Sequence, residues 1–136
     1  MSLEENKVLS RQVIDIFNSD DIESLRNMFT NNFVWHFNSQ PTMNREQFIE
    51  FTVNLRKSFP DFAFTIEDIV AENDQVVFRF IATGTHLGPL QGIAPTNKQF
   101  RVGGFEQARI TDGKISEAWE VLDLLGELQQ LGIVTP

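Results

Sequence analysis

The first 59 residues of the chain include three stretches with apolar side chains at the three- and four-residue spacing of amphipathic helices. This spacing predicts helices over residues 2–18, 20–29 and 44–59. Each of the three begins with a possible capping box, in which a Ser, Asp or Asn is followed three residues later by Glu or Gln. For the second helix this capping residue is Asp20, and Pro60 ends the third.

Beyond Pro60 the period changes to the two-residue alternation of half-buried strands. Strands are predicted there at residues 62–67, 76–83, 100–111 and 114–122. A further short, aromatic strand is predicted earlier in the chain, at residues 33–37. A loop rich in Gly and Pro occupies residues 84–97. Asp123 can cap a final helix, and Gly132 is a typical stop for it.

Helices followed by antiparallel hairpins indicate an α+β fold rather than alternating βαβ units. With 136 residues, the chain is long enough for one domain, residues 1–136, and a sizeable core. Adjacent glycines at 103 and 104 suggest a bulge or sharp bend in their strand. A strongly bent sheet, antiparallel or mixed, wrapped around the N-terminal helices would enclose a pocket.

Two glutamates occupy unusual positions on the predicted strands. Glu106 shares a face with Phe100, Val102, Gly104, Ala108 and Ile110. Glu120 ends a track of small residues that begins at Ser116 and Ala118. A carboxylate on an apolar face is costly unless it is paired, hydrogen-bonded or protonated. A salt-bridged Glu106 and an exposed Glu120 are the structural alternatives to a functional pair.

The hairpin at Asp112-Gly113 decides whether these two acids meet. A three-residue loop that includes Thr111 would place Gly104 opposite Glu120, with Glu106 one diagonal, about 7 Å, away. A two-residue turn would instead send the two glutamates to opposite faces of the sheet. The sequence leaves both registers open.

Two carboxyl groups in one apolar cavity do not both ionise easily, so the pKa of one of them should rise. The pair then provides a general acid beside a general base. Such a pair suits proton abstraction next to a carbonyl, or protonation of an oxyanion. We expect Glu120 to act as the base and Glu106 to share or return the proton.

Several other residues are expected to line the cavity: Trp35, Phe78, Phe80, His86, Val102 and Ala118. The two histidines, His36 and His86, have no ligand-like spacing to a third donor, so no metal site is predicted. A structural or loop-ordering role is the expectation for both. Phosphate-binding and dinucleotide-binding glycine motifs are missing from the sequence.

Composition narrows the possible partners and chemistries. The net charge is −8, and the sequence has no basic stripe, so nucleic acid and anionic membranes are poor partners. There are 13 Phe, 2 Trp, no Tyr and no Cys, which excludes thiolate sites, disulfides and a phenol-based oxyanion hole. The N-terminus has no basic start or apolar run, so we expect a cytoplasmic protein.

Two stretches of the sequence are distinctive. One contains Gly84-Thr85-His86-Leu87-Gly88 and then Gly92-Ile93-Ala94-Pro95-Thr96. The other runs from Arg109-Ile110-Thr111-Asp112-Gly113-Lys114-Ile115 through Trp119 and Asp123-Leu124 to Gln129-Gln130-Leu131-Gly132. Together they resemble the SnoaL-like polyketide (ester) cyclase family, within the cone-shaped superfamily of nuclear transport factor 2.

This resemblance, which covers essentially the whole chain, implies a cone-shaped α+β domain with a pocket, often a homodimer, and no cofactor. In such cyclases a carboxylate on the last strand acts as acid and base in an aldol closure, assisted by a histidine on the preceding strand. Those positions fall on Glu120 and Glu106, so both differ in residue type from the cyclases.

The expected function is a cofactor-independent acid/base enzyme acting on a small, largely apolar carbonyl compound, by aldol closure or isomerisation. The alternative is a non-catalytic protein of the same fold that binds a small ligand or forms a dimeric interaction module. A homodimer is also expected from the outer sheet face, where Phe105, Ile115, Trp119 and Val121 would form an apolar patch.

Overall fold

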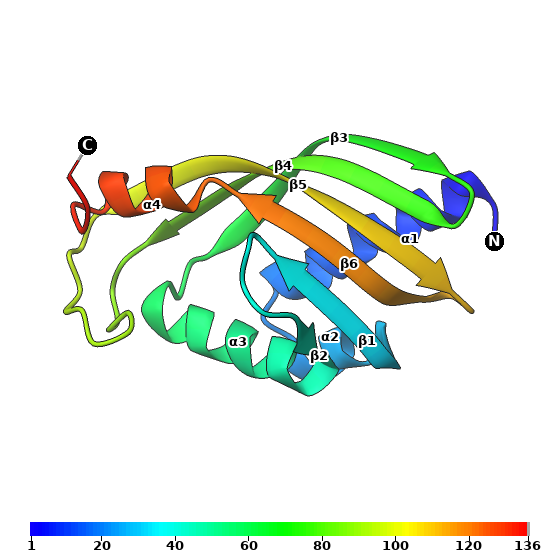
Figure 1. Ribbon diagram of the computed structural model, residues 1–136, viewed down its shortest axis with the longest axis horizontal. Coiled ribbons are helices and arrows are strands. Elements are labelled where there is room, and N and C mark those ends of the chain that lie inside the picture. Colours follow the sequence, from blue (N-terminus) through cyan, green and yellow to red (C-terminus); the bar gives the residue numbers. More distant parts are fainter. Residues whose placement is uncertain (136) are drawn as a thin grey trace.

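The computed structural model describes residues 1–135 and confirms the α+β class (Figure 1). Its helices are α1 (Leu3–Asn18), α2 (Ile22–Arg26), α3 (Arg45–Ser58) and α4 (Leu124–Gln130). No helix within the described residues is long and apolar enough to cross a membrane.

The helix starts follow the capping chemistry of the sequence, with one correction. Ser2 and Glu5 form the capping box of α1, and Asn44 with Gln47 forms that of α3. The prediction of Asp20 as the cap of α2 was wrong. Asp21 caps this helix by accepting from the Ser24 backbone N–H, because Asp20 is in the left-handed region with φ of 59°.

Six strands form a single sheet. They are β1 (Phe29–Phe37), β2 (Met43–Asn44), β3 (Ala63–Glu72), β4 (Gln75–Thr85), β5 (Gln99–Thr111) and β6 (Lys114–Leu122). Their order across the sheet is β2-β1-β6-β5-β4-β3. The β1–β6 pair is parallel and all the other pairs are antiparallel, so the sheet is mixed.

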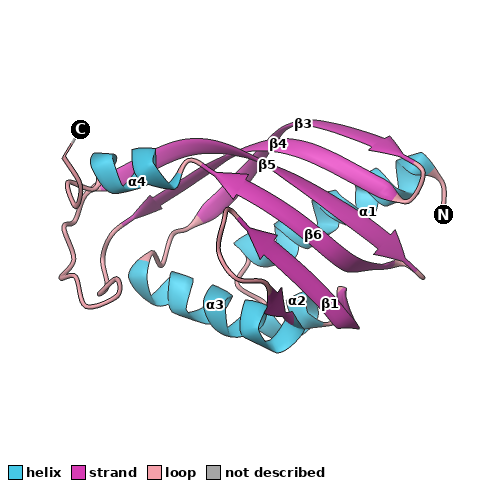
Figure 2. Ribbon diagram, viewed as in Figure 1, coloured by secondary structure: helices cyan, strands magenta, loops and turns pink. Residues whose placement is uncertain are grey.

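Figure 2 shows long, curved strands, with α1 and α3 packed along one side of the sheet. Helix α1 contacts β3, and α3 contacts β1. Asn18, at the end of α1, fixes the first of these contacts by exchanging two hydrogen bonds with the backbone of Phe64. The inner face of the sheet therefore lies under helices, and its buried residues form the core.

The glycine pair at 103 and 104 lies in regular pairing with β4, with no bulge at that point. Gly104 is needed for close packing. A Cβ there would lie 2.4 Å from both Phe80 Cζ and the Val121 carbonyl oxygen. A Cβ at Gly103 would make only ordinary van der Waals contacts, with its nearest neighbour at 3.8 Å. The register shift that matters for the candidate site lies in the β5–β6 pairing, between Arg109 and Ile110.

Candidate functional site

The β5–β6 hairpin places Glu106 directly opposite Glu120. Its turn has two residues, Asp112 and Gly113, both with positive φ (51° and 76°), as a tight hairpin turn requires. Of the two turns that the sequence left open, the structure has the two-residue one, yet the acids are neither diagonal nor on opposite faces.

A bulge in β6 explains how a two-residue turn still brings the acids together. Ile110 pairs with Ile115, whereas Arg109 pairs with Glu117, so Ser116 is the extra residue. One extra residue reverses the alternation of every side chain beyond it. Ile115 is consequently buried rather than on the outer face, and Glu120 faces inward.

Both glutamates line one large cavity of about 1000 Å³ between the sheet and the helices. Glu120 is 7% exposed. Their carboxyl groups are close enough to share a hydrogen bond when one of them is protonated. This is the arrangement in which one proton serves two acids.

The cavity environment raises both carboxyl pKa values. Burial raises the pKa of Glu106 to about 7, although the hydrogen bond to Glu120 opposes this shift. Burial, and then the charge of Glu106, raise the pKa of Glu120 well above its usual range. At neutral pH the pair therefore retains a shared proton.

Asn38 fixes the backbone on which Glu120 lies. This residue ends β1 with a positive φ of 47°, and its N–H donates to the Glu120 carbonyl at 2.9 Å. Its side-chain oxygen accepts from the Leu122 N–H, also at 2.9 Å. The end of β6 is therefore held on both sides of the acid.

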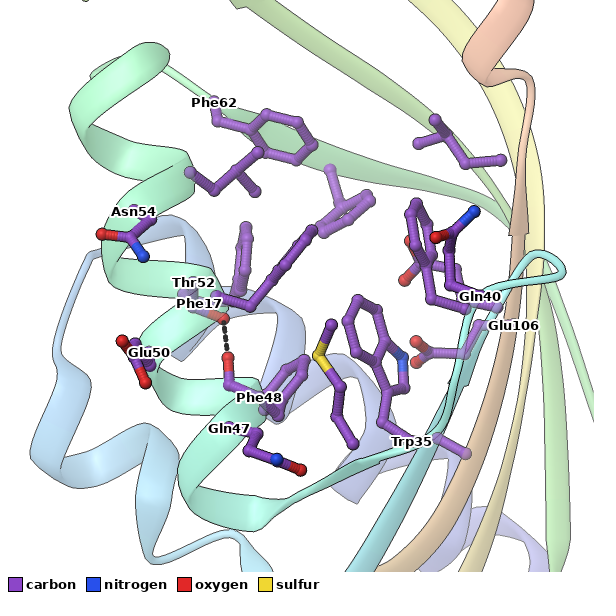
Figure 3. Close-up of a pocket in the computed structure, with 18 of the residues that line it drawn as sticks. Phe17, Trp35, Gln40, Gln47, Phe48, Glu50, Thr52, Asn54, Phe62 and Glu106 are labelled. Carbon is purple, nitrogen blue, oxygen red and sulfur yellow. Dashed lines mark hydrogen bonds between the residues drawn. The ribbon is translucent and has the colours of Figure 1, made fainter. Parts of the chain in front are cut away.

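The cavity wall is mostly aromatic and aliphatic (Figure 3). Trp35, Phe78 and Ala118 line it, as expected. Trp35 pairs with Ala118, whose small side chain leaves room for the indole beside the acid pair. The indole Nε1–H is buried and has no hydrogen-bond partner among residues 1–135.

Phe80, His86 and Val102 are placed outside this lining, in contrast to the expectation. All three are buried, at 0%, 0% and 5% exposure. The Phe80 ring packs against Phe64, at 4.8 Å between centroids, and over Gly104. These side chains belong to the packed core beside the cavity.

A model of the SnoaL-like polyketide cyclase family matches residues 7–131. The chain belongs to this family. The match extends over nearly the whole domain and confirms the resemblance drawn from the loop and hairpin motifs. A comparison with curated protein sequences finds no match.

Solved structures of similar proteins share this fold over almost their full length. AclR from Streptomyces galilaeus, a candidate hydroxylase, is 26% identical with a TM-score of 0.90, covering 99% of this chain and 85% of AclR. IdmH from Streptomyces antibioticus, a candidate polyketide cyclase, is 29% identical with a TM-score of 0.84. The match covers 93% of this chain and 98% of IdmH. TsrD from Streptomyces laurentii is 25% identical with a TM-score of 0.86. The match covers 98% of this chain and 99% of TsrD.

In this SnoaL-like domain, His86 orders a loop. The Thr96 backbone N–H donates to its Nδ1 at 3.2 Å, so the neutral ring carries its hydrogen on Nε2. The backbone N–H of His86 donates to Lys98, and that of Asn97 donates to His86. These bonds close the segment between β4 and β5, which is the loop-ordering role expected from the sequence.

His36 lies on the outer face of the sheet, away from the acid pair. Its Nε2 is 2.7 Å from the Glu117 carboxylate, and its ring stacks on Trp119 at 5.1 Å. Arg109 also contacts both Glu117 and Trp119. Within residues 1–135, no group of three or more His, Asp or Glu side chains is placed to hold a metal ion.

Sequence reasoning missed a third acid in the SnoaL-like cavity. Glu127 of α4 lines it and is only 6% exposed. Burial raises the pKa of this carboxyl to about 7. A signal was present, because Glu127 shares the helical stripe of Leu124, Leu128 and Leu131. An acid on an apolar face is the same criterion that selected Glu106.

Proposed function

We propose that this protein is a cofactor-independent acid/base enzyme acting on a small, largely apolar carbonyl compound. The observation that carries this proposal is the directly opposed pair of Glu106 and Glu120 in an apolar cavity. Membership of the SnoaL-like family supports a polyketide-like ligand and an aldol closure or isomerisation. One fold hosts many activities, so the acid pair is the stronger support.

The two carboxyls titrate as one coupled pair, so one of them is ionised and acts as the base while the other keeps its proton and acts as the acid. The assignment of Glu120 as the base stays a prediction. The ionised carboxyl removes a proton from the carbon next to the carbonyl and leaves an enolate. The protonated carboxyl donates its proton to the oxyanion formed by aldol closure or to the carbon that an isomerisation protonates. The pair then redistributes the remaining proton, and its net charge is unchanged.

Deuterium exchange tests this chemistry without knowledge of the natural substrate. The probe is 2-tetralone, a two-ring ketone with protons next to its carbonyl, in D₂O at neutral pD. We expect the wild-type protein to accelerate deuterium incorporation, measured by NMR. Glu106→Gln and Glu120→Gln should each lose at least ~10²-fold of that acceleration, the usual contribution of a general acid or base.

Glu67→Gln is the matched control. Glu67 is exposed on β3, so this substitution removes a carboxylate charge outside the cavity. It should exchange like the wild type. If 2-tetralone binds but no acceleration is seen, the proposal fails and the chain is a non-catalytic ligand-binding protein. Equal exchange by all four proteins would also contradict a role for the acid pair.

We further propose a homodimer that forms through the outer face of the sheet. Phe105 and Val121 are opposite each other on β5 and β6 and are 55% and 64% exposed. A cross-strand apolar pair this exposed is typical of a surface that a partner covers. Trp119 flanks the pair, where it packs between His36 and Arg109.

A further inference from the structure

Glu127 is buried in the cavity wall without a partner. It lines the cavity and is 94% removed from solvent, as its 6% exposure shows. None of the side-chain hydrogen bonds or ion pairs within residues 1–135 involves the Glu127 carboxyl, and burial raises its pKa. A buried carboxyl without such compensation is costly to the fold, which makes it a candidate for ligand recognition.

The remaining charges around the cavity leave this acid without a counter-ion. Glu106 and Glu120 are acids as well, and the charge of Glu127 contributes to the raised pKa of Glu120. Two further charged side chains on α3, Glu50 and Lys57, lie at the cavity and are exposed. The inner wall is therefore negative or neutral, within a chain of net charge −8.

The rest of the wall suits a flat organic cation. Aromatic rings surround the cavity, including Phe17, Trp35 and Phe48 (Figure 3). Aromatic faces attract cations, and they do so more strongly when water is excluded. A volume of about 1000 Å³ is at the upper end of the range for small-molecule sites and accepts a ligand of several rings.

We infer that the cavity takes a carbonyl ligand that also carries a basic nitrogen, whose ammonium group pairs with the Glu127 carboxylate. This inference rests on the proposed function and specifies its substrate class. The catalytic pair lies on β5 and β6, whereas Glu127 comes from α4, so recognition and proton transfer use different carboxyls. Glu127 is a binding residue in this arrangement.

Three matched probes test the inference. They are 9-(aminomethyl)anthracene, 9-(hydroxymethyl)anthracene and anthracene-9-carboxylate, which share one ring system and are cationic, neutral and anionic at neutral pH. Binding is followed by calorimetry. The wild-type protein should bind the ammonium at least ~10-fold more tightly than the alcohol, as a desolvated charge pair predicts. The carboxylate should bind most weakly.

The Glu127→Gln variant separates charge recognition from shape. It should lose at least ~10-fold in affinity for the ammonium and keep its affinity for the alcohol. Glu67→Gln, which removes an exposed charge of the same type, should change neither. Retained binding of the alcohol also shows that the variant is folded.

Proton release gives an independent readout. With its pKa raised to about 7, the Glu127 carboxyl is partly protonated near neutral pH, and an ammonium partner would keep it ionised. Binding of the ammonium should therefore release protons, measured as a dependence of the heat on the buffer. Glu106 has a similar pKa and also faces the cavity, so the decisive result is a smaller release in Glu127→Gln than in Glu106→Gln.

The inference is overturned if the wild type binds the alcohol as tightly as the ammonium, or if Glu127→Gln leaves ammonium binding unchanged. Neither result affects the proposed acid/base chemistry, which 2-tetralone exchange tests through Glu106 and Glu120. Conversely, selective ammonium binding in a protein without exchange activity would keep the inference about Glu127 as a binding residue and reject the enzyme.

Discussion

The Ser116 hydroxyl donates to the Arg109 carbonyl oxygen at 3.3 Å, within the bulge that turns Glu120 toward Glu106. The same hydroxyl is 2.9 Å from the Thr111 hydroxyl. Ser116 has no partner in the β5–β6 pairing, yet it determines on which side of the sheet the following side chains lie. The functional site therefore depends on Ser116 staying out of the pairing.

Deletion of Ser116 should keep Glu120 on the inner face, because regular pairing from the two-residue turn would again place Arg109 opposite Glu117 and Glu106 opposite Glu120. We expect the deletion variant to keep a raised Glu120 pKa, measured by carboxyl NMR titration, and to keep 2-tetralone exchange. Ser116→Ala keeps the bulge and loses both hydroxyl hydrogen bonds, so it should cost about 1–2 kcal/mol of unfolding free energy. An ordinary Glu120 pKa in the deletion variant would contradict the assignment of Ser116 as the extra residue.

This bulge also shows where sequence reasoning ended. The helix caps, the strand alternation and the Asp112-Gly113 turn are encoded locally, and from them the α+β class could be predicted. Nothing in the letters around Ser116 distinguishes a bulged residue from a paired one, since the bulge depends on how β6 packs against both neighbours. The apolar strand face singled out Glu106, but the direct pairing of Glu106 with Glu120 could not be predicted because it depends on the bulge.

Glu127 and His86 illustrate the same limit in different ways. Glu127 lies on an apolar helical stripe, so its burial could have been predicted from spacing alone. His86 shares the strand parity of Phe78, which suggested a place in the cavity wall. Instead, the loop that follows β4 holds the His86 ring against Thr96. The conformation of such a loop leaves no periodic pattern of apolar residues in the sequence, so this position could not be predicted.

Gly104→Ala should destabilise the protein by about 1–3 kcal/mol, as overpacking does. The added methyl group would meet the Phe80 ring and the Val121 carbonyl, both at 2.4 Å. Gly103→Ala is the matched control, because a methyl group there would make only ordinary van der Waals contacts, the nearest at 3.8 Å. It should be neutral or stabilise the chain by a few tenths of a kcal/mol to ~1 kcal/mol by restricting the unfolded state. Chemical denaturation measures both, and equal effects would contradict the packing argument.

Phe105→Lys should give a monomer if the outer sheet face forms the dimer. A charge at the centre of an apolar contact has no partner there and is costly to desolvate. Val70→Lys is the control, because Val70 is similarly exposed, at 59%, but lies on β3 at the edge of the sheet. Sedimentation at micromolar concentration should show a dimer for the wild type and Val70→Lys. A monomeric wild type would reject the proposed dimer.

The buried acids should make the protein less stable as the pH rises. A carboxyl whose pKa is raised on folding binds more protons in the folded state than in the unfolded state. For Glu106 and Glu127, the pKa rises from 4.5 to about 7. The contribution of these two carboxyls to the free energy of unfolding is therefore fully present below about pH 4.5, and it is lost as the pH rises through about 7. Glu120, whose pKa is raised as well, contributes in the same direction.

Glu120→Gln should therefore be more stable than the wild type at pH 8, while losing 2-tetralone exchange. Glutamine keeps the shape and can hydrogen-bond to Glu106, but it removes the charge that burial and Glu106 disfavour. Below about pH 4.5 the Glu120 carboxyl of the wild type is protonated in the folded and the unfolded chain, so the difference in thermal stability between the wild type and Glu120→Gln should nearly vanish. Thermal melts at the two pH values measure it. A variant that is less stable than the wild type at pH 8 would mean that an unrecognised cation holds Glu120, and the catalytic assignment would lose its physical basis.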